Sequence, residues 1–361
     1  MAAISDLSSK MLYCLKMMYI ATFVYDQVQH ENRRRILGRH HFIYLHGFIE
    51  LASQLKNLLK QKGDVGPVEQ LINRLRSDYE KEYKDIRNRL AAHQQGEWLD
   101  TLVALWSEVA KYNLVILTQD SETIYTHLRW IDDTIPVFEQ STEVNDTNLR
   151  NILSEVDKHD SGPIFSEAGF ALLDPRVITV IPTGLLGQCR QRIAALNDII
   201  SLELSLLRSN LSSPDVERFL KAATIVDVIS LVDTLYPIRQ LGPNASPTLY
   251  SLLQGHQHSH FIELQNAANN RKADQEKKII DARNKIGAHI DALIDLEALL
   301  VELDNVNITE LGDVAMYWQE AFRRCAESNL LLVGALAHNV PLPAGLRLAT
   351  DEDYKNSENM L

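Results

Sequence analysis

The sequence has little cysteine and no excess of basic charge, and each absence excludes a class of protein. Its three cysteines, Cys14, Cys189 and Cys325, are far apart and odd in number, so neither a disulfide framework nor a paired-cysteine zinc site is expected. This usage favours a reducing, cytoplasmic location. The formal net charge of −12 argues against a protein that coats nucleic acid nonspecifically, because such binding requires clustered Lys and Arg. A local basic cleft is still compatible with this net charge.

Long apolar runs and catalytic loop motifs are also missing. The most apolar N-terminal stretch, from Met11 to Tyr25, is interrupted by Lys16 and followed by no cleavage pattern. We therefore expect an amphipathic helix there, and neither a signal peptide nor a membrane span. The sequence contains no Gly-rich phosphate loop, no nucleophile elbow and no nucleotidyltransferase signature. Serine hydrolysis and phosphotransfer from a nucleotide are therefore poor candidates for its activity.

Helical periodicity dominates the sequence instead. Apolar residues recur every three or four positions from Leu186 to Leu207 and from Trp98 to Tyr112, which indicates long helices in an all-α fold. Ser213 followed by Pro214 predicts a helix start, with an N-cap and a proline at the first helical position. We expect that helix to end at Pro237.

The 361 residues are enough for two domains, and the pattern weakens once between them. From about 132 to 183 the sequence is polar and punctuated by proline, with a short helix expected at 148–156 and the best strand candidate at 177–181. We therefore predict an N-terminal helical domain at 1–133, a connector at 134–183, a C-terminal helical domain at 184–345 and an acidic tail at 346–361.

An internal repeat is the strongest signal in the sequence. Residues 78–93 (DYEKEYKDIRNRLAAH) align without a gap to residues 274–289 (DQEKKIIDARNKIGAH), with eight of sixteen positions identical. Unrelated segments would match at about one position. The identities are polar except for Ala92 and Ala288. Because exposed residues of a duplicated helix can change at little cost in stability, their retention indicates a shared task, although recent duplication would leave the same trace.

The end of each repeat resembles a known motif. Arg87-Asn88 is followed by Ala92-His93, and the second copy has the same four residue types at the same spacing. This pattern on a helix resembles the HEPN superfamily, whose ribonuclease members carry an Arg, four to six arbitrary residues and a His, and most of all its AbiU2-type branch, which is associated with abortive phage infection. The resemblance implies two HEPN-like up-and-down helical bundles in tandem, paired about a pseudo-two-fold axis with their motifs facing.

The resemblance also implies a function, namely a metal-independent endoribonuclease with one composite site, no cofactor and RNA as its substrate. The catalytic residues would be Arg87, Asn88, His93, Arg283, Asn284 and His289, and the substrate-binding residues would be Lys81, Lys84, Arg89, Lys277 and Lys285. The implied setting is bacterial antiphage defence or a toxin-like role in the cytoplasm, with an antitoxin or defence-system protein as a partner and no membrane. The chain could also form a homodimer.

The chemistry of RNA cleavage fits these residue types. Histidine can act as base on the 2′-hydroxyl and as acid on the leaving 5′-oxygen, because its ordinary pKa lies near ~6.5. Arginine stays charged and can stabilise the developing phosphorane. Residues six apart are separated by about 240° on a helix, so Arg87 and His93 do not share a face. One site therefore requires both motifs.

Other interpretations of these residues are open on the sequence alone. The motif residues could be ordinary helix surface, with Asp85 paired to Arg89, or could belong to a non-catalytic interaction module of the HEPN type. The basic run 33–41, which includes Arg33, Arg39, His40 and His41, could contact RNA or form a solvated helix end. A metal-binding regulator that uses the histidines of 256–260 is the most distant alternative.

Overall fold

The computed structural model describes residues 2–84, 109–139, 147–158, 180–182, 185–209, 211, 213–240, 295–316 and 346–348. This part of the chain is helical apart from one short pair of strands, which confirms the predicted all-α class. The helices are α1 (Ala2–Gln27), α2 (Glu31–Leu59), α3 (Gly66–Asp78), the π-helix η1 (Tyr79–Tyr83), α6 (Leu114–Ile131), α7 (Thr147–Lys158), α8 (Leu185–Arg208), α9 (Pro214–Gln240) and α13 (Leu296–Asp304).

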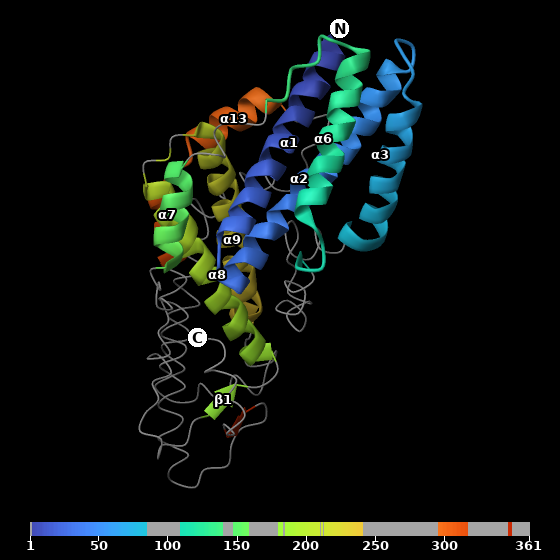
Figure 1. Cartoon of the computed structure of the whole chain (residues 1–361). Helices are drawn as coiled ribbons and strands as arrows, with labels where there is room; N and C mark the ends of the chain where they lie inside the picture. Colours follow the sequence, from blue (N-terminus) through green and yellow to red (C-terminus); the bar gives the residue numbers. More distant parts are fainter. Residues whose placement is uncertain are drawn as a thin grey trace, which may run out of the picture.

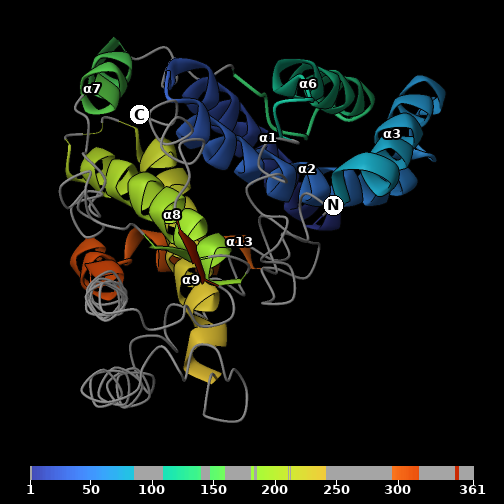
Figure 2. The ribbon, with the colours of Figure 1, turned by 90° about the horizontal axis from the view of Figure 1, so that it is seen from below.

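Helices α1 and α2 form a hairpin at the centre of the bundle. Figures 1 and 2 show α3 and α6 on one side of this hairpin, and α8 and α9 with α7 and α13 on the other. The helix predicted over Met11 to Tyr25 is present, but it is not amphipathic, since only Ser5, Asp6 and Asp26 are exposed among its described side chains. The reason is its position, because α2, α6, α7 and α9 all contact α1.

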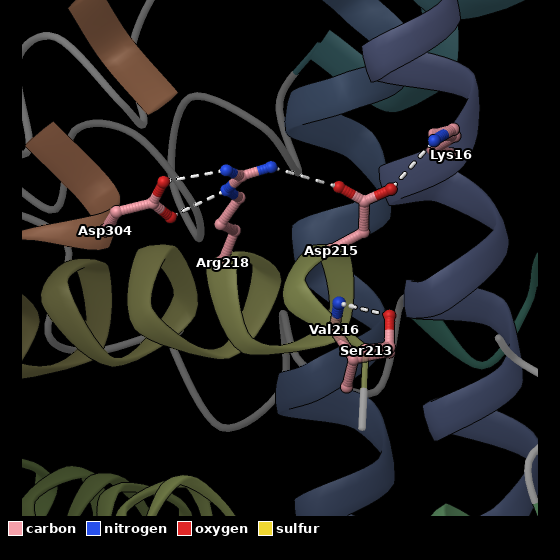
Figure 3. A network of polar contacts seen from close by, with 6 residues as sticks. All are labelled: Lys16, Ser213, Asp215, Val216, Arg218 and Asp304. Atoms are coloured by element: carbon pink, nitrogen blue, oxygen red, sulfur yellow. Dashed lines mark hydrogen bonds and ion pairs between the residues drawn. The ribbon is translucent and has the colours of Figure 1, made fainter. Parts of the chain in front are cut away.

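The start of α9 agrees with its sequence, while its end does not. The backbone N–H of Val216 donates to the Ser213 hydroxyl at 3.3 Å, as expected of an N-cap (Figure 3). The helix continues through Pro237 to Gln240, so the prediction that it ends at the proline is wrong. A proline removes its own N–H bond and crowds the carbonyl four residues before it, but the N–H groups that follow it can still bond within the helix.

The connector contains the elements expected from its sequence. The predicted helix at 148–156 corresponds to α7, and the predicted strand at 177–181 overlaps β1 (Val180–Pro182). β1 pairs antiparallel with β2 (Leu346–Leu348), so part of the segment predicted as a tail returns to the connector. Among the helices described, none has both the length and the apolar composition that a membrane crossing needs.

Candidate functional site

Lys81 and Lys84 are the predicted site residues that the structure describes. They lie at the end of the helix that begins with α3, where η1 replaces the regular α-helix immediately before the first motif. The other predicted site residues lie outside the described residues, namely Arg87, Asn88, Arg89, His93, Lys277, Arg283, Asn284, Lys285 and His289. A composite site therefore stays a prediction.

The π-helical turn is held against α2 while its lysines face solvent. Tyr79 is buried and its ring stacks on His46 with centroids 4.9 Å apart and planes 20° apart. Lys81 and Lys84 are exposed, and the Lys84 ammonium pairs with Glu80 at 2.7 Å. Because Glu80 and Glu82 alternate with these lysines, η1 and the residue after it contribute no net basic charge. Single π turns inside helices are often found at functional sites, since they re-aim the side chains around them.

Most of the basic run 33–41 is buried and forms neither an RNA-contacting patch nor a solvated helix end, whereas the side chain of Arg34 is 42% exposed and pairs with Asp26 at 3.7 Å. Arg33 is 3% exposed and donates to both carboxylate oxygens of Asp198 on α8, at 2.7 and 2.6 Å. Arg39, His40 and His41 are buried as well. The run lies on α2, where Arg33 and Arg39 bond to α8 and α9, so these buried cations are paired in the interior of the molecule.

A buried polar cluster is the most unusual arrangement in the described part of the chain. Arg39 and His40 come from α2, Glu203 from α8 and Asp227 from α9, and none of their side chains is more than 2% exposed. The Arg39 guanidinium forms an ion pair with Asp227 Oδ1, and His40 Nε2 lies 3.4 Å from Asp227 Oδ2. The consecutive helices α8 and α9 therefore meet the distant helix α2 at buried polar and charged groups.

Burial shifts the pKa values of this cluster. It lowers the pKa of His40 well below its ordinary value, and the positive charge of Arg39 lowers it further, so the imidazole is neutral. Burial also raises the pKa of Glu203 to about 8, against the opposing effects of Arg39 and Thr224. The Glu203 carboxyl therefore holds a proton at neutral pH when nothing else neutralises it.

The histidine next to the cluster has a different role. His41 Nε2 lies 2.9 Å from the Thr118 hydroxyl of α6, on the opposite side of α2. Burial lowers the pKa of His41 to about 3, so it is a neutral hydrogen-bonding group. The histidines of 256–260 lie outside the described residues. Among the residues that the structure describes, His40, Glu203 and Asp227 could hold a metal ion.

Sequence reasoning missed Glu203 and Asp227, although a signal was present. Glu203 stands between Leu202 and Leu204, and Asp227 stands between Val226 and Val228, inside strongly apolar helices. Carboxylates are almost never fully buried unless they are paired, so such positions are candidates for a buried polar site. No model of a protein family, no curated protein and no solved structure matches the chain.

Proposed function

We propose that this chain is a metal-independent endoribonuclease of the HEPN type, with one composite site made by its two Arg-Asn-x4-His motifs. The observation that carries the proposal is the internal repeat, in which the identical positions are the polar ones. Packing alone would preserve apolar positions first, whereas a shared chemical task preserves the polar ones.

The arrangement of the helices supports the pairing of two motifs within one chain. Helices α1 and α2 form one hairpin, and α8 and α9 form another. α1 contacts α9 and α2 contacts α8, so the first helix of each hairpin meets the second helix of the other. A pseudo-two-fold pair of modules would produce this pattern of contacts. Lys81 and Lys84 are exposed directly before the first motif, and a phosphate group that binds Lys84 would replace its pairing with Glu80.

In the proposed mechanism, one of His93 and His289 removes the proton from the 2′-hydroxyl, and the oxygen then attacks the neighbouring phosphorus. The other histidine protonates the departing 5′-oxygen, which leaves a 2′,3′-cyclic phosphate. Arg87 and Arg283 stabilise the charge that develops on the phosphorane oxygens. Asn88 and Asn284 orient an imidazole or a phosphate oxygen. Antiphage defence or a toxin-like role is the biological setting that the resemblance suggests.

The test is RNA cleavage by the purified full-length chain in EDTA, with circular dichroism recorded in the same buffer to verify folding. We expect products ending in cyclic phosphate from the wild type and none from His93→Ala/His289→Ala. The matched control, His127→Ala, removes a partly exposed imidazole on α6 and should cleave like the wild type.

Single variants distinguish one composite site from two independent sites. If the motifs form one site, His93→Ala alone and His289→Ala alone should each reduce cleavage by roughly 100-fold or more, as expected of residues that act as a unit. If the motifs form two independent sites, each single variant should retain about half of the wild-type activity. Equal cleavage by the wild type and the double variant would contradict the mechanism. RNA binding without any cleavage would support the non-catalytic module instead.

A further inference from the structure

The cluster of His40, Glu203 and Asp227 has the spacing of metal ligands. One ligand atom from each residue lies within 4.8 Å of the other two, and all three side chains are buried. His40 Nε2 and Asp227 Oδ2 are 3.4 Å apart, which is long for a hydrogen bond. Two ligand atoms at about 2.1 Å from one ion, in tetrahedral geometry, are separated by about 3.4 Å. The Glu203 ligand atom lies within 4.8 Å of these two, so a side-chain movement of about 1 Å would bring it to the ion.

Glu203 is the independent sign that something binds in this cluster. Neither of its carboxylate oxygens has a hydrogen-bond partner among the described residues, although the residue is fully buried. The Thr224 hydroxyl is close enough to lower the pKa of Glu203, but it donates its hydrogen to the Leu220 carbonyl at 2.8 Å, so it does not donate to either oxygen. A proton on Glu203 would remove its charge and make one oxygen a donor, but the other oxygen would still lack a donor. A cation would satisfy them directly.

The charges of the cluster leave room for a divalent ion. Arg39 and Asp227 neutralise each other, and the guanidinium contacts Asp227 Oδ1 while Oδ2 faces His40. One carboxylate can thus face the ion with one oxygen and bond a second-shell cation with the other. Two carboxylates, one guanidinium, a divalent ion and a hydroxide as fourth ligand together leave the cluster neutral. His40 can offer Nε2, which lies 3.4 Å from Asp227 Oδ2, as its ligand atom.

We propose that His40, Glu203 and Asp227 bind one divalent transition-metal ion that fastens α2 to α8 and α9. An imidazole nitrogen with two carboxylates suits Zn²⁺, Co²⁺ or Mn²⁺, whereas Ca²⁺ and Mg²⁺ prefer sites made only of oxygen. Because the ligands are fully buried and come from three helices, the ion is structural. It is separate from the metal-independent chemistry proposed for the two motifs.

The test uses the full-length chain, expressed without a polyhistidine tag. Elemental analysis of the purified chain should find about one metal ion per chain. After the metal has been removed with dipicolinate, titration with Zn²⁺ should restore about one ion per chain. Glu203→Gln should weaken Zn²⁺ binding by roughly tenfold or more. The matched control is His256→Ala/His258→Ala/His260→Ala, which should bind Zn²⁺ like the wild type.

A second measurement does not depend on the folding of the Glu203 variant. Co²⁺ added to the metal-free wild type and to the triple histidine variant should give the same visible bands of four-coordinate cobalt, and should raise the thermal unfolding midpoint of both. Loss of these signals in the triple variant would assign the ion to the other histidines and overturn the proposal. Failure of the wild type to bind Zn²⁺ or Co²⁺ would overturn it too. RNA cleavage is a separate readout, so either proposal can fail alone.

Discussion

The two sides of the α1–α2 hairpin bury polar groups of different kinds. Towards α6, the buried polar contacts are neutral, with Thr118 bonded to both His41 and Thr22, at 2.9 and 3.0 Å. Towards α8 and α9, the buried contacts are ionic, with Arg39 against Asp227 and Arg33 against Asp198. Both sides have ion pairs at their rims, where solvent screens them.

The two kinds of buried contact differ in whether they contribute to the stability of the fold or to the choice of one packing. Removing charges from water costs several kcal/mol for each ion, so a buried ion pair adds little net stability even when it is well formed. Breaking one partner, however, leaves an uncompensated charge. We infer that the ionic side selects one docking of α8 and α9 on α2, since a shifted packing would strand Arg39 or Asp227. The neutral side relies on apolar packing and tolerates a lost bond more easily.

The largest effect is expected from Arg39→Met, which removes the buried guanidinium that pairs with Asp227 Oδ1. It should lower the free energy of unfolding by about 3–5 kcal/mol, measured by urea denaturation. The double variant Arg39→Met/Asp227→Leu should recover much of this loss, because the pair is then replaced by apolar side chains. A double variant that is as unstable as the sum of its single variants would contradict an ionic contact between the two residues.

A smaller effect is expected on the neutral side from Thr118→Val, which keeps the shape of the side chain but removes the hydroxyl bonded to His41 and Thr22. The buried imidazole would lose a partner, at a cost of about 2 kcal/mol in the free energy of unfolding. Because the groups are neutral, this cost should not change between low and high salt. A strong salt dependence would show that His41 is charged.

At the rim of the ionic side, Arg218→Ala removes a partly exposed network. Arg218 bonds both carboxylate oxygens of Asp304 at 2.7 Å, and Asp215 in turn pairs with Lys16 on α1 (Figure 3). We expect a loss of about 1 kcal/mol in the free energy of unfolding, reduced further in high salt. Lys84→Ala, which removes a fully solvent-facing pair, is the matched control and should change stability by less than about 0.5 kcal/mol.

At the rim of the neutral side, Asp132→Asn tests a pH dependence. The Lys62 ammonium and the Thr134 hydroxyl hold the pKa of Asp132 down at about 2, below its ordinary value. The stabilisation is therefore complete above the unfolded pKa, near 4, and is lost as the pH falls towards 2. The variant should be less stable than the wild type by about 1 kcal/mol at pH 7, with the difference vanishing near pH 2. A difference that persists at pH 2 would contradict the ion pair.

The helices were largely predictable because they depend on local patterns. Apolar residues at helical spacing predicted α8, and the Ser213-Pro214 pair predicted the start of α9. The end of α9 was mispredicted, since a single proline near a helix terminus costs less than the rule for helix interiors implies. The burial of α1 on almost every side was also not predicted. Lys16 suggested a solvent-facing side of this helix, and the sequence does not reveal how many helices surround α1.

The sequence by itself determined that the chain forms long helices and that it carries two copies of an Arg-Asn-x4-His motif, because both are properties of residues close together in the chain. Only the tertiary structure decided which charges are buried. Arg39, Glu203 and Asp227 come from three helices, and although Glu203 and Asp227 stand between apolar residues, nothing in the sequence shows that the three meet. Desolvation and pairing depend on neighbours from distant segments, so the same arginine is a surface cation or a buried partner according to what packs against it.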